Sequence, residues 1–249
     1  MWKDRENVIA LGEEFINICK KNDFWYTADA GTMLGAIRNN GIIPWDDDFD
    51  VMMTYDSYLK LKKMFPNRVI DTDTNGYPLI LPKFMNDKTK FLESAVFVDI
   101  FIVIPSNLES VKKYRSFRNK TRFAMQTVHS EWNSFNLGSK ILKVISWPFK
   151  SIPQKITLQE VVMTLTVPPN QVEVYFTIDN PIDPLKINWQ KDISFKRKEV
   201  KFENFKIQVP IEYNDILIQK YGTNYMIPDK HQRSIEHINA ISIVKVKRK

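Results

Sequence analysis

The sequence predicts an α+β fold in which helices pack on the faces of a β-sheet. The first observation is an amphipathic helix over residues 4–22, where apolar residues recur at helical spacing. The second is a pair of short apolar runs, 48–53 and 97–101, that have the length and composition of strands. The third is a helical stretch over 55–65, which we expect on one face of that sheet. The apolar face of the first helix contains Val8, Leu11, Phe15 and Ile18.

The remaining elements are predicted from turn residues and apolar periodicity. In the N-terminal half we expect a strand at 24–28, a helix at 32–38, strands at 68–72 and 77–85, and a helix at 108–133. In the C-terminal half we expect a hairpin of strands 158–167 and 172–178, and a strand pair over 193–209 that turns at Glu203 and Asn204. A helix at 211–221, ended by Gly222, and a loop over 221–228 follow.

Length and composition limit the class of protein. The 249 residues suffice to bury a sizeable core as one domain, and 43% of them are hydrophobic. The single cysteine, Cys19, excludes an internal disulfide and a cysteine zinc site, which favours a reducing compartment. The N-terminus has the pattern of neither a signal peptide nor a membrane span. We therefore expect a cytoplasmic protein that is either soluble or peripheral at a membrane.

The net charge of +7 is positive despite an acidic cluster, so the rest of the surface is basic. Such a surface suits an anionic nucleotide, a phospholipid surface or nucleic acid. The basic helix at 108–133 is typical of a solvated face, and His129 near its end is expected to be structural. Residues 137–155 predict a basic amphipathic helix, which suits either an anionic membrane interface or packing on the core. No helix-turn-helix, zinc finger or RNA-binding aromatic motif is present, so we expect no nucleic-acid partner.

The most informative stretch runs from Gly31 to Val51 and holds four acids close together. If 48–53 forms a strand, Asp48 and Asp50 point to one face, about 7 Å apart along the strand. Two carboxylates fixed in this way repel each other unless a cation lies between them. Such oxygen ligands suit Mg²⁺ or Mn²⁺, which also bind substrate phosphates, whereas the alternative is a solvated acidic turn. The four acids are Asp46, Asp47, Asp48 and Asp50.

A fifth acid, Asp99, interrupts the apolar run 97–101. An isolated charge is not placed in such a run without compensation. A strand beside 48–51 would bring Asp99 to the same metal ions as the first two acids. The alternative is a core aspartate whose carboxylate is satisfied by backbone donors.

Four further residues are candidates for contacts with phosphate. Gly31 and Thr32 open a helix, whose backbone N–H groups can face an anion, although Thr32 can equally cap that helix. Arg38 could bind a phosphate, pair with the acidic cluster or lie in solvent. Lys83 could contact a nucleotide phosphate or be solvated. Trp45 is expected to pack at the rim of the site, with stacking on a base as the lesser alternative.

The residues of this stretch resemble a known family. The Gly-Thr, Asp-Phe-Asp and Val-Asp-Ile elements resemble the nucleotidyltransferase fold of the DNA polymerase β type, and the full string GTMLGAIRNNGIIPWDDDFDV resembles the LicD/fukutin family of phosphotransferases. A second block agrees with that family's C-terminal pattern of a strand pair, a proline, a helix and a YG–YM–P loop. It includes Phe202–Phe205, Val209, Pro210, Tyr213, Leu217, Tyr221, Gly222, Tyr225, Met226, Pro228 and His237.

The resemblance implies a nucleotidyltransferase-like mixed sheet with a C-terminal helical and strand elaboration. Residues 1–105 would form the catalytic core, 106–155 a basic helical segment, and 156–249 a part that completes the same domain. The implied catalytic residues are Asp48, Asp50 and Asp99. The implied metal ligands are Asp48, Asp50, Asp99 and Asp46, with Mg²⁺ or Mn²⁺ as the cofactor. The implied donor-binding residues are Gly31, Thr32, Arg38 and Lys83.

Three functions remain open from the sequence. The first is transfer of a phosphoalcohol, of the phosphocholine or ribitol-phosphate type, from a CDP-activated donor to a hydroxyl of a glycan or lipid-linked glycan. The second is a nucleotidyltransferase that leaves the nucleotide on its acceptor, because the same three acids serve both reactions. The third is a non-enzymatic basic module that binds nucleic acid or an anionic membrane. Tyr221, Tyr225 and His237 either wall the substrate pocket or pack the C-terminal loop on the core.

Overall fold

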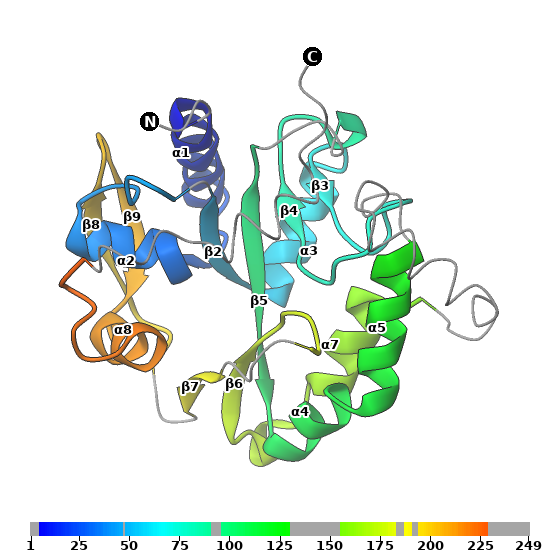
Figure 1. Cartoon of the computed structure of the whole chain (residues 1–249). Coiled ribbons are helices and arrows are strands. Elements are labelled where there is room, and N and C mark those ends of the chain that lie inside the picture. The colour runs from blue at the N-terminus through cyan, green and yellow to red at the C-terminus, as the bar shows by residue number, and fades with distance from the viewer. Residues whose placement is uncertain are drawn as a thin grey trace.

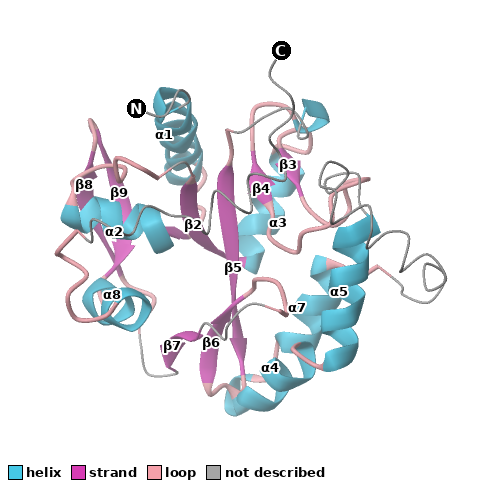
Figure 2. Ribbon diagram, viewed as in Figure 1, coloured by secondary structure: helices cyan, strands magenta, loops and turns pink. Residues whose placement is uncertain are grey.

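The structure is a computed structural model, and it describes residues 5–46, 48–90, 96–129, 155–182, 187–190 and 194–228. For residue 129 and residues 187–190 it describes the backbone only. A seven-stranded mixed sheet forms the centre, with strand order β1-β2-β5-β4-β3 and with β6 and β7 continuing from β5 (Figure 1, Figure 2). Its strands are β1 (Tyr26–Ala28), β2 (Phe49–Thr54), β3 (Val69–Ile70), β4 (Lys83–Phe84), β5 (Val98–Ser106), β6 (Val174–Thr177) and β7 (Ile187–Gln190). The predicted α+β class, with helices on a mixed sheet, is confirmed.

The parallel pair of β2 and β5 is the axis of the sheet. Asp50 lies opposite Asp99 in this register. β1 and β4 flank the pair as antiparallel strands, and β4 places Lys83 opposite Asp99. Both strands of the pair are almost entirely buried, as expected for strands covered on both faces. The first residues of β2 and β5 therefore meet at one point of the sheet.

Helices cover the sheet and lie at its edges (Figure 1). α1 buries the predicted apolar face, except that Ile18 is only half-buried, and it packs against β2 and β5. Thr54 caps α3 by accepting a hydrogen bond from the Ser57 N–H group, which ends β2 and begins the helix in one step. The helices are α1 (Arg5–Lys21), α2 (Ala30–Arg38), α3 (Tyr55–Met64), α4 (Leu108–Tyr114), α5 (Phe117–His129), α7 (Leu158–Leu165) and α8 (Tyr213–Tyr221), with short 3₁₀ turns at Lys88–Lys90 and Pro169–Gln171. No helix among them is long and apolar enough to cross a membrane.

A C-terminal hairpin and helix pack on the N-terminal part of the chain. The hairpin consists of β8 (Arg197–Phe202) and β9 (Phe205–Pro210), and it turns at Glu203 and Asn204 as predicted. The Glu203 carboxylate accepts hydrogen bonds from Arg5 at 2.6 Å and from the Ile42 N–H at 3.0 Å. α8 ends at Gly222, whose φ of 83° is a conformation that favours glycine. These elements lie beside α2 on one side of the central strands (Figure 1).

Three predictions about secondary structure were wrong. Residues 158–165 form a helix instead of a strand, because their buried residues lie at helical spacing and Thr157 caps the first turn. The helix expected over 108–133 is two helices, broken at Arg115, with Lys120 N–H bonded to Ser116 O at the start of the second. The strands expected at 68–72 and 77–85 contain only two paired residues each. The amphipathic helix predicted at 137–155 lies almost wholly outside the described residues.

Candidate active site

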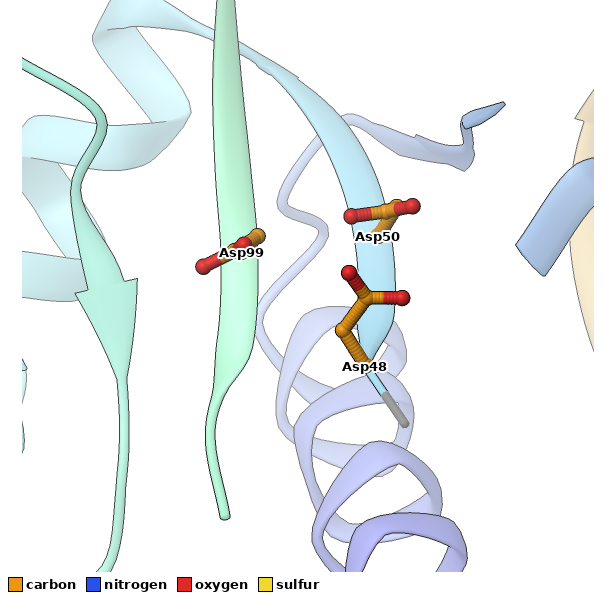
Figure 3. Close-up of side chains that lie close together, drawn as sticks. All are labelled: Asp48, Asp50 and Asp99. Carbon is orange, nitrogen blue, oxygen red and sulfur yellow. The ribbon is translucent and has the colours of Figure 1, made fainter. Parts of the chain in front are cut away.

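Three acids from two neighbouring strands meet in the interior. Asp48 directly precedes β2, Asp50 is its second residue, and Asp99 is the second residue of β5. Their side chains lie on the same side of the sheet (Figure 3), and one carboxylate oxygen of each lies within 4.8 Å of the others. All three residues are buried, with 5%, 3% and 7% of their surfaces exposed. We refer to Asp48, Asp50 and Asp99 as the triad.

The triad concentrates negative charge where water is scarce. Burial raises the pKa of Asp50 well above its usual value, and the charges of Asp48 and Asp99 raise it further, followed by Asp46 and Asp29. A cation among these oxygens would remove both effects. Three carboxylate donors are hard oxygen ligands, so the triad fits a divalent cation such as Mg²⁺ or Mn²⁺ and could hold one.

The backbone of Asp50 is fixed from the start of α2. Its N–H group donates to the Thr32 hydroxyl at 2.7 Å, and its carbonyl accepts from the Asp29 N–H group at 3.1 Å. α2 begins at Ala30, so Thr32 does not cap the helix, and its hydroxyl anchors β2 instead. The sequence suggested that Thr32 either caps the helix or binds a phosphate. It did not suggest this hydrogen bond between Thr32 and Asp50.

Gly31 brings the first turn of α2 against Asp46. A Cβ atom at Gly31 would lie 2.3 Å from Asp46 Oδ2, so any other residue at this position would have to displace the Asp46 carboxylate. The Asp46 carboxylate therefore lies against Gly31, and whether the start of α2 binds a phosphate stays a prediction. Among the described residues, the acids close enough to share an ion are those of the triad, and Asp46 is not one of them. Asp47 lies outside the described residues.

Lys83 lies on the other side of the triad. Its ammonium group is buried, forms an ion pair with Asp99 Oδ1, and lies 3.6 Å from the centroid of the Phe97 ring. The alternative of a solvated Lys83 is therefore wrong. Whether it contacts a phosphate stays a prediction, and its partner here is a carboxylate of the triad.

Arg38 contacts the loop that follows α8. Arg38 donates to the Tyr225 carbonyl at 3.2 Å and to the Asn39 side chain at 3.0 Å. Burial lowers the pKa of Arg38, while Tyr221 and Asp46 act in the opposite direction. Burial raises the pKa of Tyr221, and the charge of Asp50 raises it further.

The other aromatic candidates are less involved in this region. The Tyr225 hydroxyl donates to Asn214 at 2.7 Å and so packs the C-terminal loop. Trp45, expected to be packed, is 39% exposed. His237 lies outside the described residues.

An ion pair between Asp29 and Lys220 was missed by the sequence reasoning. Asp29 is 2% exposed and precedes α2, and Lys220 reaches it from α8. Asp29 carried a usable signal, because it stands between the apolar strand β1 and the Gly31-Thr32 pair. Lys220 carried none, because only the folded chain brings residue 220 to residue 29.

Comparisons with known proteins agree with this site. The model of the family described as LicD/FKTN/FKRP, nucleotidyltransferase domain, matches residues 24–136. The lipopolysaccharide cholinephosphotransferase LicD of Haemophilus influenzae is 26% identical over an alignment of 259 positions, which covers 92% of this chain and 93% of that protein. The uncharacterized proteins RP689 of Rickettsia prowazekii and RT0683 of Rickettsia typhi are 41% and 39% identical over 46 residues, 18% of this chain. The family match contains the whole triad, and the similarity to LicD extends over almost the whole of both chains.

Proposed function

We propose that this protein is a divalent-metal-dependent phosphotransferase. It moves a phosphoalcohol, of the phosphocholine or ribitol-phosphate type, from a CDP-activated donor to a hydroxyl group of a glycan or lipid-linked glycan. The observation that carries the proposal is the triad: three buried carboxylates from adjacent parallel strands, with oxygens within 4.8 Å of one another. The similarity to a lipopolysaccharide cholinephosphotransferase supports the choice of donor and acceptor.

The reaction is a substitution at phosphorus. The acceptor oxygen forms a bond to the phosphorus that carries the alcohol, and the bond from this phosphorus to the bridging oxygen of the diphosphate breaks. CMP leaves with that oxygen, and the proton of the acceptor hydroxyl passes to a carboxylate, for which Asp99 is our candidate. A bound Mg²⁺ or Mn²⁺ ion would neutralise charge on the diphosphate and on the leaving oxygen.

The chain supplies binding and orientation. Asp48, Asp50 and Asp99 would hold the cation, and we retain Asp46 as a further ligand or as a group that orients them. Thr32 keeps Asp50 in place through its backbone N–H group. Arg38 is half-buried, contacts the loop that follows α8, and carries a positive charge that would stabilise a phosphate of the donor.

A nucleotidyltransferase is the second candidate, because the matching family model is described as a nucleotidyltransferase domain. It would use the same triad, but the acceptor would receive the nucleotide instead of the phosphoalcohol. The two reactions differ only in which phosphorus is attacked. Their products therefore separate them, whereas the arrangement of acids does not. A non-enzymatic basic module would not need three buried carboxylates in one place.

The test is a screen of CDP- and UDP-activated compounds with Mg²⁺ and with glycan acceptors. Mass spectrometry would follow both the released nucleotide and the mass gained by the acceptor. We expect free CMP and an acceptor that gains a phosphoalcohol. A nucleotide on the acceptor would favour the second candidate, and a chelator-insensitive reaction would remove the metal from the proposal.

A further inference from the structure

Lys83 is a buried cation that the proposed transfer reaction does not use. It is 5% exposed, and β4 places it directly opposite Asp99 in the sheet. Its ammonium group is bonded to Asp99 and lies over the face of Phe97, an arrangement in which both a carboxylate and an aromatic ring stabilise the charge. These two contacts fix the position of the Lys83 ammonium group beside Asp99.

The position of Lys83 changes the charge that the triad presents. When all three carboxylates are ionised to bind a cation, the ammonium group leaves two net negative charges, which is the charge that one divalent cation balances. A second divalent cation bound to Asp99 would lie close to the Lys83 ammonium group, because both would contact the same carboxylate. Two positive charges that close together repel strongly in a buried site. The same ammonium group reduces the attraction that Asp99 exerts on the first cation.

We infer that Lys83 is a fixed internal counter-ion of the triad. It holds Asp99 in place, limits the triad to one divalent cation before the donor binds, and weakens the binding of that cation. This inference rests on the proposed divalent-cation site. It assigns Lys83 as a positioning residue whose contact is a triad carboxylate, in place of the donor phosphate that the sequence suggested.

The test compares Mn²⁺ binding by the full chain and by variants in the absence of donor. Isothermal titration calorimetry gives stoichiometry and affinity, and thermal unfolding is measured in EDTA and in saturating Mn²⁺. We expect one Mn²⁺ ion per wild-type chain. Lys83→Met should bind Mn²⁺ at least about tenfold more tightly, because a positive charge next to the cation is gone. Its melting temperature should fall in EDTA and should rise more on addition of Mn²⁺ than that of the wild type. Lys83→Arg should keep an affinity close to that of the wild type.

Lys62→Met is a matched control. Lys62 forms an ion pair at 2.6 Å with Asp71, whose side chain is 3% exposed, and Asp71 is not part of the triad. This variant should lose stability equally in EDTA and in Mn²⁺, and its affinity for Mn²⁺ should not change.

Unchanged or weaker Mn²⁺ binding by Lys83→Met would overturn the inference. So would a Lys83→Met protein that stays unfolded in saturating Mn²⁺, because the cation should replace the missing charge. Failure of the metal site itself has a different signature: the wild type and Asp50→Asn would then both fail to bind Mn²⁺.

Discussion

Replacing Asp50 by asparagine should stabilise the metal-free protein and abolish binding of a divalent cation. Asp50 is 3% exposed, and burial and then the charges of Asp48 and Asp99 raise its pKa. Asparagine has nearly the same shape without the charge. Asp50→Asn therefore removes repulsion within the triad while leaving its packing in place, and it also removes a ligand that the cation needs.

The size of the gain follows from the geometry of the triad. Two unit charges at 4.8 Å, the upper limit among these oxygens, repel by about 3–4 kcal/mol at an effective dielectric constant of about 20. Protonation limits the effect, because a neutral Asp50 no longer repels its neighbours. At pH 7, protonating a carboxyl group whose ordinary pKa is 3.8 costs at most about 4 kcal/mol, at about 1.36 kcal/mol per pKa unit. The repulsion that Asp50 adds to the folded state cannot exceed this cost. We expect about 2–4 kcal/mol more unfolding free energy in EDTA, or about 5–15 °C in melting temperature.

The gain should depend on pH in a direction that the raised pKa fixes. A folded-state pKa above the unfolded value means that the folded protein binds this proton more tightly. The stabilisation of the folded protein by the proton on Asp50 is thus fully present below about pH 4. It is lost as the pH rises through the raised pKa of the folded state. In EDTA, the difference in stability between Asp50→Asn and the wild type should therefore grow from pH 4 towards neutral pH.

The assay is thermal and denaturant-induced unfolding in EDTA and in Mn²⁺ across that pH range, together with nucleotide release. Asp50→Asn should show no Mn²⁺-induced stabilisation and no measurable turnover. Asp73→Asn is the control, because Asp73 is an exposed acid paired with Lys62 and its loss should change stability by at most about 0.5 kcal/mol. An Asp50→Asn protein that is less stable than the wild type in EDTA, or that Mn²⁺ still stabilises, would refute the reasoning.

Three other substitutions test the support of the triad. Thr32→Val removes the acceptor for the buried Asp50 N–H group and should lower the unfolding free energy by about 1–3 kcal/mol, whereas Thr32→Ser should retain most of it, as denaturant titration will measure. Gly31→Ala places a methyl group 2.3 Å from Asp46 Oδ2, so we expect slower nucleotide release and a stability loss of about 1–3 kcal/mol. Lys220→Met leaves the buried Asp29 carboxylate without its cation and should lower the unfolding free energy by about 3–5 kcal/mol. Neutralising the Asp29 carboxylate should recover much of this loss.

The local pattern of the sequence predicted that Asp48 and Asp50 share a face, and it made Asp99 a candidate for the same site on the condition that the two strands pair. Asp48 and Asp50 are two residues apart at the start of an apolar strand, so their side chains lie on the same face. Asp99 lies in the second short apolar run, 97–101. The parallel pairing of β2 with β5 then places Asp50 opposite Asp99. A pattern of period two identifies such residues because the side-chain direction is fixed by the backbone of each strand.

Contacts between distant segments could not be predicted in the same way. The Asp29–Lys220 pair and the hydrogen bonds of Glu203 join residues more than 150 positions apart, and no local pattern specifies them. The helix at 158–165 was missed for another reason. Its two valines and its threonine favour a strand by propensity, whereas burial of residues at helical spacing determined the outcome. Propensity is the weaker of these two influences.

The site is assembled from both ends of the chain, and this bears on where its specificity resides. The triad and its anchor Thr32 come from the segment that the family model matches, which ends at residue 136. α8 lies far beyond that segment, yet its Lys220 pairs with Asp29, and the charge of Asp50 contributes to the raised pKa of Tyr221. We therefore propose that residues 156–249 complete the catalytic domain instead of forming a separate one. Because a triad of acids suits any phosphoryl transfer, the proposed function would place the choice between alcohols, and between acceptors, in α8 and its loop.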